Sequence, residues 1–465
     1  MDNSKIKDIF PRTAFNKRLA QLQEVSRLPR FISEYLITQF CGEDPSKDSL
    51  EKLSQFVRTH YPEPKDKDKI LHDLMTQGVY RLIDEFKVET DIYLGTHVLN
   101  IPSLTIRDAR ILNSVVEEYE NLLRSGIWGL GTLKYVPGSP ADEPLSPVLL
   151  EELTPFQTPK VDLTEFCEKR KHFSTEEWID LIINTIGLNP DAYDENAKRV
   201  LIARLIPLVE PNCNIMELGP RATGKTYFYR NMSFYTRIIS GGKVSPAIMF
   251  YNIATKRIGE VAMRDTLIFD EISKISFANP EEMMGKMKDY MVDGFFERGP
   301  KKAHSTCSMV LMGNIDIKEE IPVENLQEAI PQFMRDSAFI DRVNGLIPGW
   351  VLPKITKSER HLSQEYGLAT DYFCEILHEL HKLDFQHYIT EKVSLGDETL
   401  IRDEKSIKKL ASGMLKILCP AGDFSEDELK ICMDLAVGYR QRITDWLNWL
   451  APQEFKAQRL TWRMR

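Results

Sequence analysis

The stretch Gly219-Pro-Arg-Ala-Thr-Gly-Lys-Thr226 decides the fold of this 465-residue chain, because it fits the pattern G-x-x-x-x-G-K-[ST] without departure. An apolar strand is expected just before it, at 214–218, and a helix just after it, at 227–232. In such a turn the backbone N–H groups surround phosphate oxygens, and the dipole of the following helix adds to the attraction. The sequence therefore predicts a phosphate-binding turn between a strand and a helix.

The side chains of this turn have separate expected roles toward ATP and Mg²⁺. Lys225 would reach the β- and γ-phosphate oxygens, and the Thr226 hydroxyl would ligate the metal ion. The expected nucleotide contacts are Gly219, Pro220, Arg221, Ala222, Thr223, Gly224, Lys225, Thr226 and Tyr227.

A second segment, Thr266-Leu-Ile-Phe-Asp-Glu271, is an apolar strand that ends in two carboxylates. Asp270 would hold the Mg²⁺ shell, and Glu271 would orient and polarise the attacking water. The strand matches a Walker B element. Its Asp-Glu pair favours ATP hydrolysis over binding alone.

A third apolar strand, at 308–312, leads into Gly313-Asn314. Asn314 is expected to act as a sensor of the γ-phosphate, although a polar residue there also suits a capped turn. A further cation must offset the charge on the transferred phosphoryl group, often from a neighbouring subunit. Arg342 is preferred for that role over Arg335, and a structural ion pair is the alternative for either. The lid residues Lys405, Lys408 and Lys409 are the candidates for a second sensor.

The pattern of elements predicts an α/β P-loop core of the AAA+ type, a parallel sheet with helices on both faces and a hairpin before the third motif. An α+β domain is expected at 1–136, with a role in DNA binding or assembly, and includes a helix at 106–123. A Pro-rich linker is expected at 137–163, the AAA+ core at 164–350, and a helical lid and tail at 351–465.

Composition narrows the class of protein. The net charge of −9 argues against a chain that coats nucleic acid with its whole surface, while a local basic element remains compatible with it. Seven dispersed cysteines without a C-x-x-C pair indicate reduced thiols. The start lacks the apolar run of a signal peptide, and no apolar stretch is long enough to span a bilayer. We therefore expect a cytoplasmic protein without a membrane partner.

Two segments are candidates for contact with DNA in the channel of a ring. The stretch from Gly294 to Ser308 predicts a hairpin around a Gly-Pro turn, with Arg298, Lys301 and Lys302 near its tip. An ordinary solvated turn is the alternative. The predicted loop at 240–246 carries Lys243 and no aromatic residue, which favours nucleic acid over polypeptide as the substrate.

Several longer stretches resemble the BrxL family, the Lon-related ATPases of BREX phage-defence systems. They include KHFSTEEWIDLIINTIGLNP (171–190), IISGGKVSPAIMFYN, MKDYMVDGFFERG, AFIDRVNGLIPGW and, near the start, RLPRFISEYLITQFC. The resemblance implies AAA+ proteins that form hexameric rings, which can pair end to end, and that bind DNA and work with other phage-defence proteins. It implies the same roles for Lys225, Thr226, Asp270, Glu271, Asn314 and Arg342.

The resemblance also has one departure. Long members carry a C-terminal Lon protease-like domain with a Ser–Lys dyad, and nothing like its Gly-Pro-Ser-Ala-Gly setting occurs here. We therefore expect a short form without peptidase activity. Two other functions stay open: a protein-remodelling ATPase that lost its protease, and a scaffold that ATP binding assembles.

Overall fold

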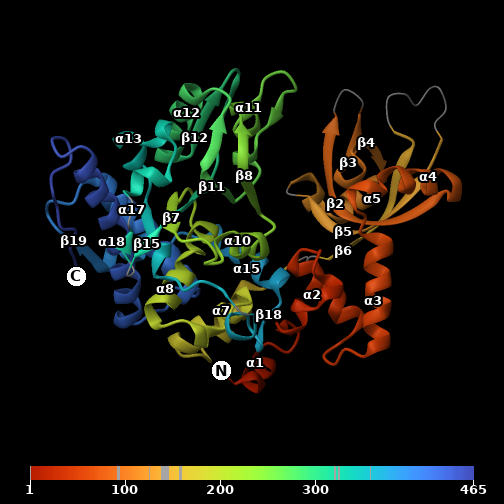
Figure 1. Cartoon of the computed structure of the whole chain (residues 1–465), viewed down its shortest axis with the longest axis horizontal. Coiled ribbons are helices and arrows are strands. Elements are labelled where there is room, and N and C mark those ends of the chain that lie inside the picture. Colours follow the sequence, from red (N-terminus) through yellow and green to blue (C-terminus); the bar gives the residue numbers. More distant parts are fainter. Residues whose placement is uncertain are drawn as a thin grey trace. The chain divides into compact units, whose positions relative to one another are not determined.

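The computed structural model describes residues 2–91, 95–124, 126–137, 146–156, 160–318, 321–322, 325–356 and 358–465 (Figure 1). The chain forms two compact units. One comprises Arg18–Lys160, and the other combines Met1–Lys17 with Val161–Arg465.

The larger unit is built on a five-stranded parallel sheet in the order β17-β7-β14-β11-β8. The strands are β7 (Ile215–Gly219), β8 (Thr236–Val244), β11 (Thr266–Phe277), β14 (Ser308–Asn314) and β17 (Gly345–Pro348). Parallel strands covered on both faces are apolar throughout, and β7 and β14 are buried almost along their whole length. The strand that leads into the P-loop therefore lies inside the sheet, with β14 between it and β11.

Helices cover both faces of this sheet. Ile268, Val310 and Ile347 face one apolar cluster, and Leu267, Leu311 and Leu346 face the other. The first cluster contains α7 (Thr175–Ile186), α8 (Glu195–Ala203), α9 (Ile206–Val209), α10 (Lys225–Met232), α15 (Thr370–His381), α17 (Ile401–Leu418) and much of α18 (Glu426–Leu450). The second contains α11 (Pro246–Met249), α12 (Pro280–Asp293), α13 (Ser337–Ile340) and the end of α18. The expected α/β core with helices on both faces is thus present.

Two short hairpins belong to the same unit. Strands β12 (Phe295–Arg298) and β13 (Lys301–His304) form the hairpin expected before β14. Strands β9 (Tyr251–Asn252) and β10 (Arg257–Ile258) form a second hairpin that the sequence did not suggest. Arg298 donates to the carbonyl of Tyr251, so the two hairpins lie side by side.

The two ends of the chain are tied into this unit. The N-terminal α1 (Asn3–Ile9) is followed by β1 (Ala14–Asn16), which pairs with β18 (Tyr366–Leu368), and Lys5 forms an ion pair with Glu177 at 2.7 Å. Near the C-terminus β20 (Trp462–Met464) pairs with β19 (Val393–Leu395), beside α16 (Gln386–Lys392). The expected lid therefore packs in one unit with the core, and also includes the short α14 (Ser358–His361).

The smaller unit is a closed barrel with strand order β2-β3-β4-β6-β5. Its strands are β2 (Val79–Asp91), β3 (Thr96–Ile101), β4 (Ile106–Ile111), β5 (Ile127–Tyr135) and β6 (Val148–Pro155). The neighbours pair antiparallel except β4 and β6, which are parallel. This order, with helix α5 (Asn113–Glu118) between β4 and β5, is that of an OB fold. Helices α2 (Arg30–Phe40), α3 (Lys47–His60) and α4 (Lys67–Gln77) precede the barrel.

Two sequence expectations are wrong in this unit. The expected linker at 137–163 contains strand β6, because Val148, Leu150 and Leu153 are needed to close the barrel core. The expected helix at 106–123 is instead strand β4 followed by the short α5. Both segments have apolar residues whose spacing fits more than one kind of element, and pairing with neighbouring strands decides between them.

Among the described residues, no helix is both long and apolar enough to cross a membrane.

Candidate nucleotide site

The P-loop turn contains two residues in the left-handed region, one of them a glycine. Ala222 and Gly224 have φ of 67° and 76°, and α10 starts directly afterwards at Lys225. A Cβ on Gly219 would lie 2.5 Å from the carbonyl carbon of Gly349, so the segment after β17 packs closely on the start of the turn. The N–H of Ile355 donates to the carbonyl of Ala222 at 2.8 Å and fixes the turn from the same segment.

The two residues expected to hold Mg²⁺ meet at the carboxyl end of the sheet. Thr226 Oγ1 donates to Asp270 Oδ2 at 2.7 Å, and Ser240 Oγ contacts the same oxygen at 3.3 Å. Hydroxyl and carboxylate oxygens are the hard ligands that Mg²⁺ prefers. The residues therefore fit the ion, which Thr226 and Asp270 would hold. Ser240 was not among the predicted residues of this site, and it reaches Asp270 because β8 pairs with β11.

Lys225 lies 7% exposed beneath the turn, where its Nζ donates to the carbonyls of Gly219 (2.9 Å) and Pro220 (2.8 Å). Burial lowers the pKa of Lys225 to about 8, because removal from water disfavours the charged amine. The negative charge of bound phosphates would favour the protonated amine and would raise the pKa of Lys225 again.

This shift predicts that ATP affinity depends on pH. Below about pH 8 Lys225 is already charged, and we expect little effect of this group on binding. Above that pH the free protein must take up a proton to bind ATP, so the affinity should fall by up to about tenfold per pH unit. Calorimetric titration with MgATP from pH 7 to pH 9.5, in two buffers of different ionisation enthalpy, measures both affinity and proton uptake. A constant affinity without proton uptake would contradict this assignment.

Glu271 occupies a strained position beside the site. It lies in the bulge where the pairing of β11 with β8 shifts, between Asp270 and Ile275, and its φ is 49°. Non-glycine residues rarely adopt that conformation, and such strain is common at functional sites. Its two carboxylate oxygens accept hydrogen bonds from Lys274 Nζ, both at 2.9 Å. Glu271 thus lies next to Asp270 with its carboxylate held by Lys274.

Asn314, the expected sensor, is the last residue of β14 and is paired in register with Gly219 of β7. Its half-buried side chain therefore lies beside the P-loop. The other predicted contact residues are placed differently. Arg221 is exposed at the outside of the turn, Tyr227 packs against the apolar cluster of α7 and α8, and Thr223 is buried with its hydroxyl donating to the carbonyl of Pro220.

A buried ion pair between Arg204 and Glu217 contacts the backbone of the P-loop turn, and the sequence did not predict it. Arg204 donates to both carboxylate oxygens of Glu217 on β7 at 2.6 and 3.0 Å, and also contacts the carbonyl of Thr223 at 3.3 Å. Both charged side chains are fully buried. The only sequence signal was an arginine inside the apolar run 200–209. Arg204 is a positioning residue, because it joins β7 to the P-loop backbone.

Both candidate arginine fingers lie near α13. Arg335 Nε donates to the carbonyl of Ile330, and Arg342 donates to the carbonyls of Lys288 and Ala338. Neither is in an ion pair with a described residue. Two residues after Arg342, Asn344 N donates to Asn214 O at 2.7 Å, so Arg342 lies at the amino-terminal edge of the sheet. The structure therefore does not bring Arg342 to the P-loop of its own chain.

The structure alters the expected DNA contacts. Arg298 flanks the Gly299-Pro300 turn as expected, but its side chain is largely buried and tied to Glu282 at 3.1 Å. Lys301 and Lys302 are in β13, and Lys302 is exposed and forms an ion pair with Glu297 at 3.2 Å. Lys243 is exposed but lies in β8, which continues alongside β11 beyond the bulge, so the expected loop at 240–246 is wrong.

Several polar side chains of α17 have partners within the chain, and the candidate sensor Lys408 pairs with Glu404 at 2.6 Å. Lys409, a candidate sensor, donates to the carbonyl of Asn212 ahead of β7, at the edge opposite the P-loop. Ser412 and Lys416, one turn apart on α17, are fully buried and both bind the carboxylate of Glu210. That arrangement occupies the serine hydroxyl and the lysine with a structural role.

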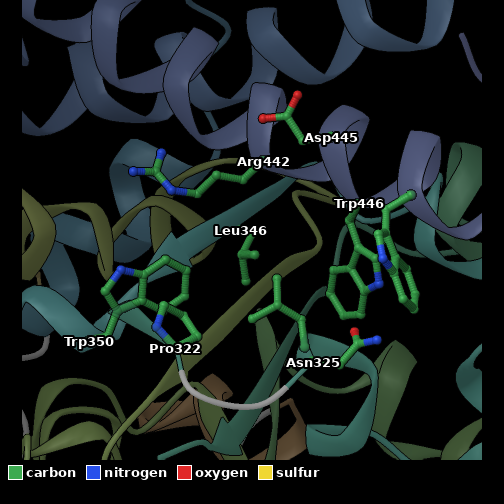
Figure 2. Close-up of a pocket in the computed structure, with 9 residues that line it drawn as sticks. Pro322, Asn325, Leu346, Trp350, Arg442, Asp445 and Trp446 are labelled. Carbon is green, nitrogen blue, oxygen red and sulfur yellow. The ribbon is translucent and has the colours of Figure 1, made fainter. Parts of the chain in front are cut away.

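A cavity of about 460 Å³ borders strand β17 and helix α18, and Figure 2 shows the residues that line it. Trp350 and Leu346 come from β17 and the turn after it, while Trp446 and Trp449 come from α18. Arg442 and Asp445 contribute one charge of each sign. This largely aromatic wall, with one charge of each sign, is unsuited to phosphates, in contrast to the P-loop.

The parallel sheet, the phosphate-binding turn and the strand β11, which carries Asp270 and Glu271 at its bulge and continues to Phe277, define an AAA+-like P-loop ATPase domain. A family model described as "Lon-like protease BrxL-like, ATPase domain" matches residues 148–461, and "BREX system Lon protease-like protein BrxL N-terminal" matches residues 8–135. The chain belongs to the BrxL family. The family predicted from its sequence motifs is thereby confirmed.

Two curated relatives extend this comparison, both named "Lon-like protease BrxL". The protein of Escherichia coli O9:H4 (strain HS) is 33% identical over 440 residues, which are 94% of this chain and 63% of that protein. The protein of Bacillus cereus (strain H3081.97) is 32% identical over 460 residues, 97% of this chain and 68% of that protein. The chain thus spans roughly two thirds of the length of each relative.

Proposed function

We propose that this chain is a ring-forming ATPase that binds DNA and couples ATP hydrolysis to DNA translocation or remodelling in anti-phage, BREX-type defence. The observation that carries the ATPase part is the meeting of Thr226, Asp270 and Lys225 at the end of β7, with Glu271 adjacent. Mg²⁺ held there would neutralise charge on the phosphates. Glu271 would orient and deprotonate water once its carboxylate leaves Lys274, and Lys225 would hold the phosphate oxygens.

The position of Arg342 supports assembly into a ring. Arg342 lies at the sheet edge opposite its own P-loop, so it can reach phosphates only on another molecule. A trans arginine is a common feature of phosphoryl-transfer enzymes that act as assemblies. We propose a hexamer, which could pair into a double ring, as the assembly.

Two features support DNA as the substrate. The smaller unit is an OB-type barrel, a fold used repeatedly for nucleic-acid binding. The paired hairpins carry Lys301, Lys302 and Lys256, the last at the turn of β9 and β10. The exposed large apolar residues of the described barrel are Val79, Leu112 and Leu123, none of them aromatic. We therefore propose contact with the phosphate backbone and not stacking on bases.

One observation favours protein remodelling as a second candidate. The same two hairpins carry Ile253, Ile258 and Phe295, whose side chains are 51%, 45% and 59% exposed. Exposed apolar residues on a loop surface suit contact with an unfolded polypeptide or with another subunit.

The test is ATPase activity of the purified protein alone, with duplex DNA, and with an unfolded protein, in wild type and Glu271→Gln. Stimulation by DNA, absent in Glu271→Gln, is the result expected. Stimulation by unfolded protein alone would select the remodelling function. Defence activity retained in full by Glu271→Gln would instead identify a scaffold that ATP binding assembles.

The hairpin lysines provide a specific prediction. Replacing Lys301 and Lys302 by alanine should weaken DNA binding and lower the slope of log affinity against log salt by about 2, because two phosphate contacts are lost. Fluorescence anisotropy with a labelled duplex at several salt concentrations measures both quantities. The matched control is Lys430→Ala with Lys456→Ala, which removes the same charge from exposed positions on α18 and the tail. Equal effects of the two pairs would contradict a specific role for the hairpin.

A further inference from the structure

A cationic pocket of about 220 Å³ lies at the amino-terminal edge of the sheet. Its polar wall consists of Arg342, Asn344, Arg402, Lys405, Ser406 and Lys409. Three apolar side chains from α12 and the start of α17 complete it. Arg342 thus shares one concave surface with lysines of α17.

This pocket cannot serve the nucleotide of its own chain. Asn344 is hydrogen-bonded to Asn214 ahead of β7 and to Ser406 on α17, which fixes the pocket at the start of the strand. The P-loop follows the other end of β7. A strand of five residues spans roughly 16 Å at 3.3 Å per residue, and the sheet itself fills that distance. Any phosphate in the pocket must therefore belong to another molecule.

The charges in and around the pocket do not cancel. Arg402 and the buried Arg440 are balanced by Asp341 and Asp403, with Arg440 Nε donating to Asp403 at 2.6 Å. In the hydrogen bonds to described residues, Arg342 and Lys409 donate to neutral oxygen atoms. Within the part of the chain that the structure describes, Lys405 has no hydrogen-bond or ion-pair partner. Among the described residues these three cations thus lack an ion-pair partner, while Glu210 and Asp293 act on Lys409 from a greater distance.

We infer that this pocket receives the terminal phosphate of ATP bound to an adjacent copy of the chain, with Lys405 as a second trans-acting cation beside Arg342. The inference rests on the proposed ring assembly. The pocket is large enough for a phosphate group and too small for a nucleic-acid duplex. Burial lowers the pKa of Lys409, because removal from water disfavours its charged form, and an anion in the pocket would stabilise that charge. The three cations would together offset charge on the phosphoryl oxygens as the bond to the β-phosphate breaks.

Subunit mixing tests the trans arrangement directly. We expect Lys405→Ala alone to lower ATPase activity by about tenfold or more, and Glu271→Gln alone to be inactive. Co-expression of the two variants gives mixed rings. At some interfaces in these rings, a Lys405→Ala subunit supplies an intact Glu271 and its neighbour, a Glu271→Gln subunit, supplies an intact Lys405. Random assembly should restore about a quarter of the wild-type rate per subunit. A mixture no more active than the mean of its two components would overturn the inference.

A second measurement does not require hydrolysis and separates this inference from the proposed motor function. In the Glu271→Gln background, the ATP concentration that half-assembles the ring is measured by sedimentation velocity. Lys405→Ala should raise it by about tenfold, and Lys405→Arg should restore it. The matched control is Lys408→Ala, which removes the same charge one turn along α17, where it pairs with Glu404 at 2.6 Å. Equal effects of Lys405→Ala and Lys408→Ala would overturn the inference, and so would a protein that stays monomeric with ATP.

Discussion

Replacing Glu271 by glutamine is expected to lower ATP hydrolysis by about 10²- to 10⁴-fold, because the amide cannot accept the proton of the attacking water. ATP binding should be retained, since Lys225, Thr226 and Asp270 keep their contacts. The two quantities are measured by phosphate release and by calorimetric titration with MgATP. A loss of both together would indicate that Glu271 acts on the shape of the site and not on the water.

The matched control for that variant is Lys274→Ala. Lys274 holds the Glu271 carboxylate in an exposed ion pair, with side chains 59% and 38% exposed, and such pairs contribute little to stability. We expect Lys274→Ala to keep the ATPase activity or to raise it, because the carboxylate no longer has to leave a partner before it engages water. A loss as severe as that of Glu271→Gln would mean that Lys274 itself contacts the nucleotide.

The second large effect, on both stability and ATP affinity, is expected when the fully buried Arg204 is replaced by methionine. It removes the partner of the fully buried Glu217 and leaves an uncompensated charge, which typically costs about 3–5 kcal/mol of unfolding free energy. It also removes the donor that holds the Thr223 carbonyl, so ATP affinity should fall with stability. Denaturant unfolding with and without MgATP measures both effects.

Two further variants keep that prediction testable. Arg199→Ala removes a half-exposed arginine from α8, the helix that Arg204 caps, where its pair with Glu195 is 3.5 Å long, and should change stability by less than about 0.5 kcal/mol. Arg204→Lys keeps the positive charge but cannot reach both Glu217 and Thr223, so it should fold and still bind ATP weakly. Wild-type ATP affinity in Arg204→Lys would contradict the positioning role.

The local chemistry of the nucleotide site could be predicted from sequence because its residues are close together along the chain or at strand ends. The turn Gly219–Thr226 prescribes its own backbone, and an apolar strand that leads into Asp270 places that residue near the P-loop if both strands are parallel. Sequence spacing could not show Ser240 at the same oxygen, because that contact depends on the register of β8 with β11.

Where the spacing of apolar residues fitted both a helix and a strand, pairing with distant strands determined the secondary structure. Residues 106–111 fit a helix as well as a strand, and only the partners Leu99 and Leu149 in β3 and β6 make them β4. The prolines of 137–163 indicated a linker, yet β6 is the strand that closes the barrel between β4 and β5. Propensity is a weak guide wherever long-range hydrogen bonds are available.

The sequence by itself determined that this chain carries a P-loop, a Walker B strand and the motifs of the BrxL family, because each is a short pattern whose chemistry needs neighbouring residues. Only the tertiary structure decided which charges are available. It placed Arg298 in an ion pair with Glu282, Arg204 under the P-loop, and Arg342 beside Lys405 at the opposite sheet edge. The physical reason is that burial and pairing of a charged side chain depend on residues far away along the chain, which no local pattern encodes.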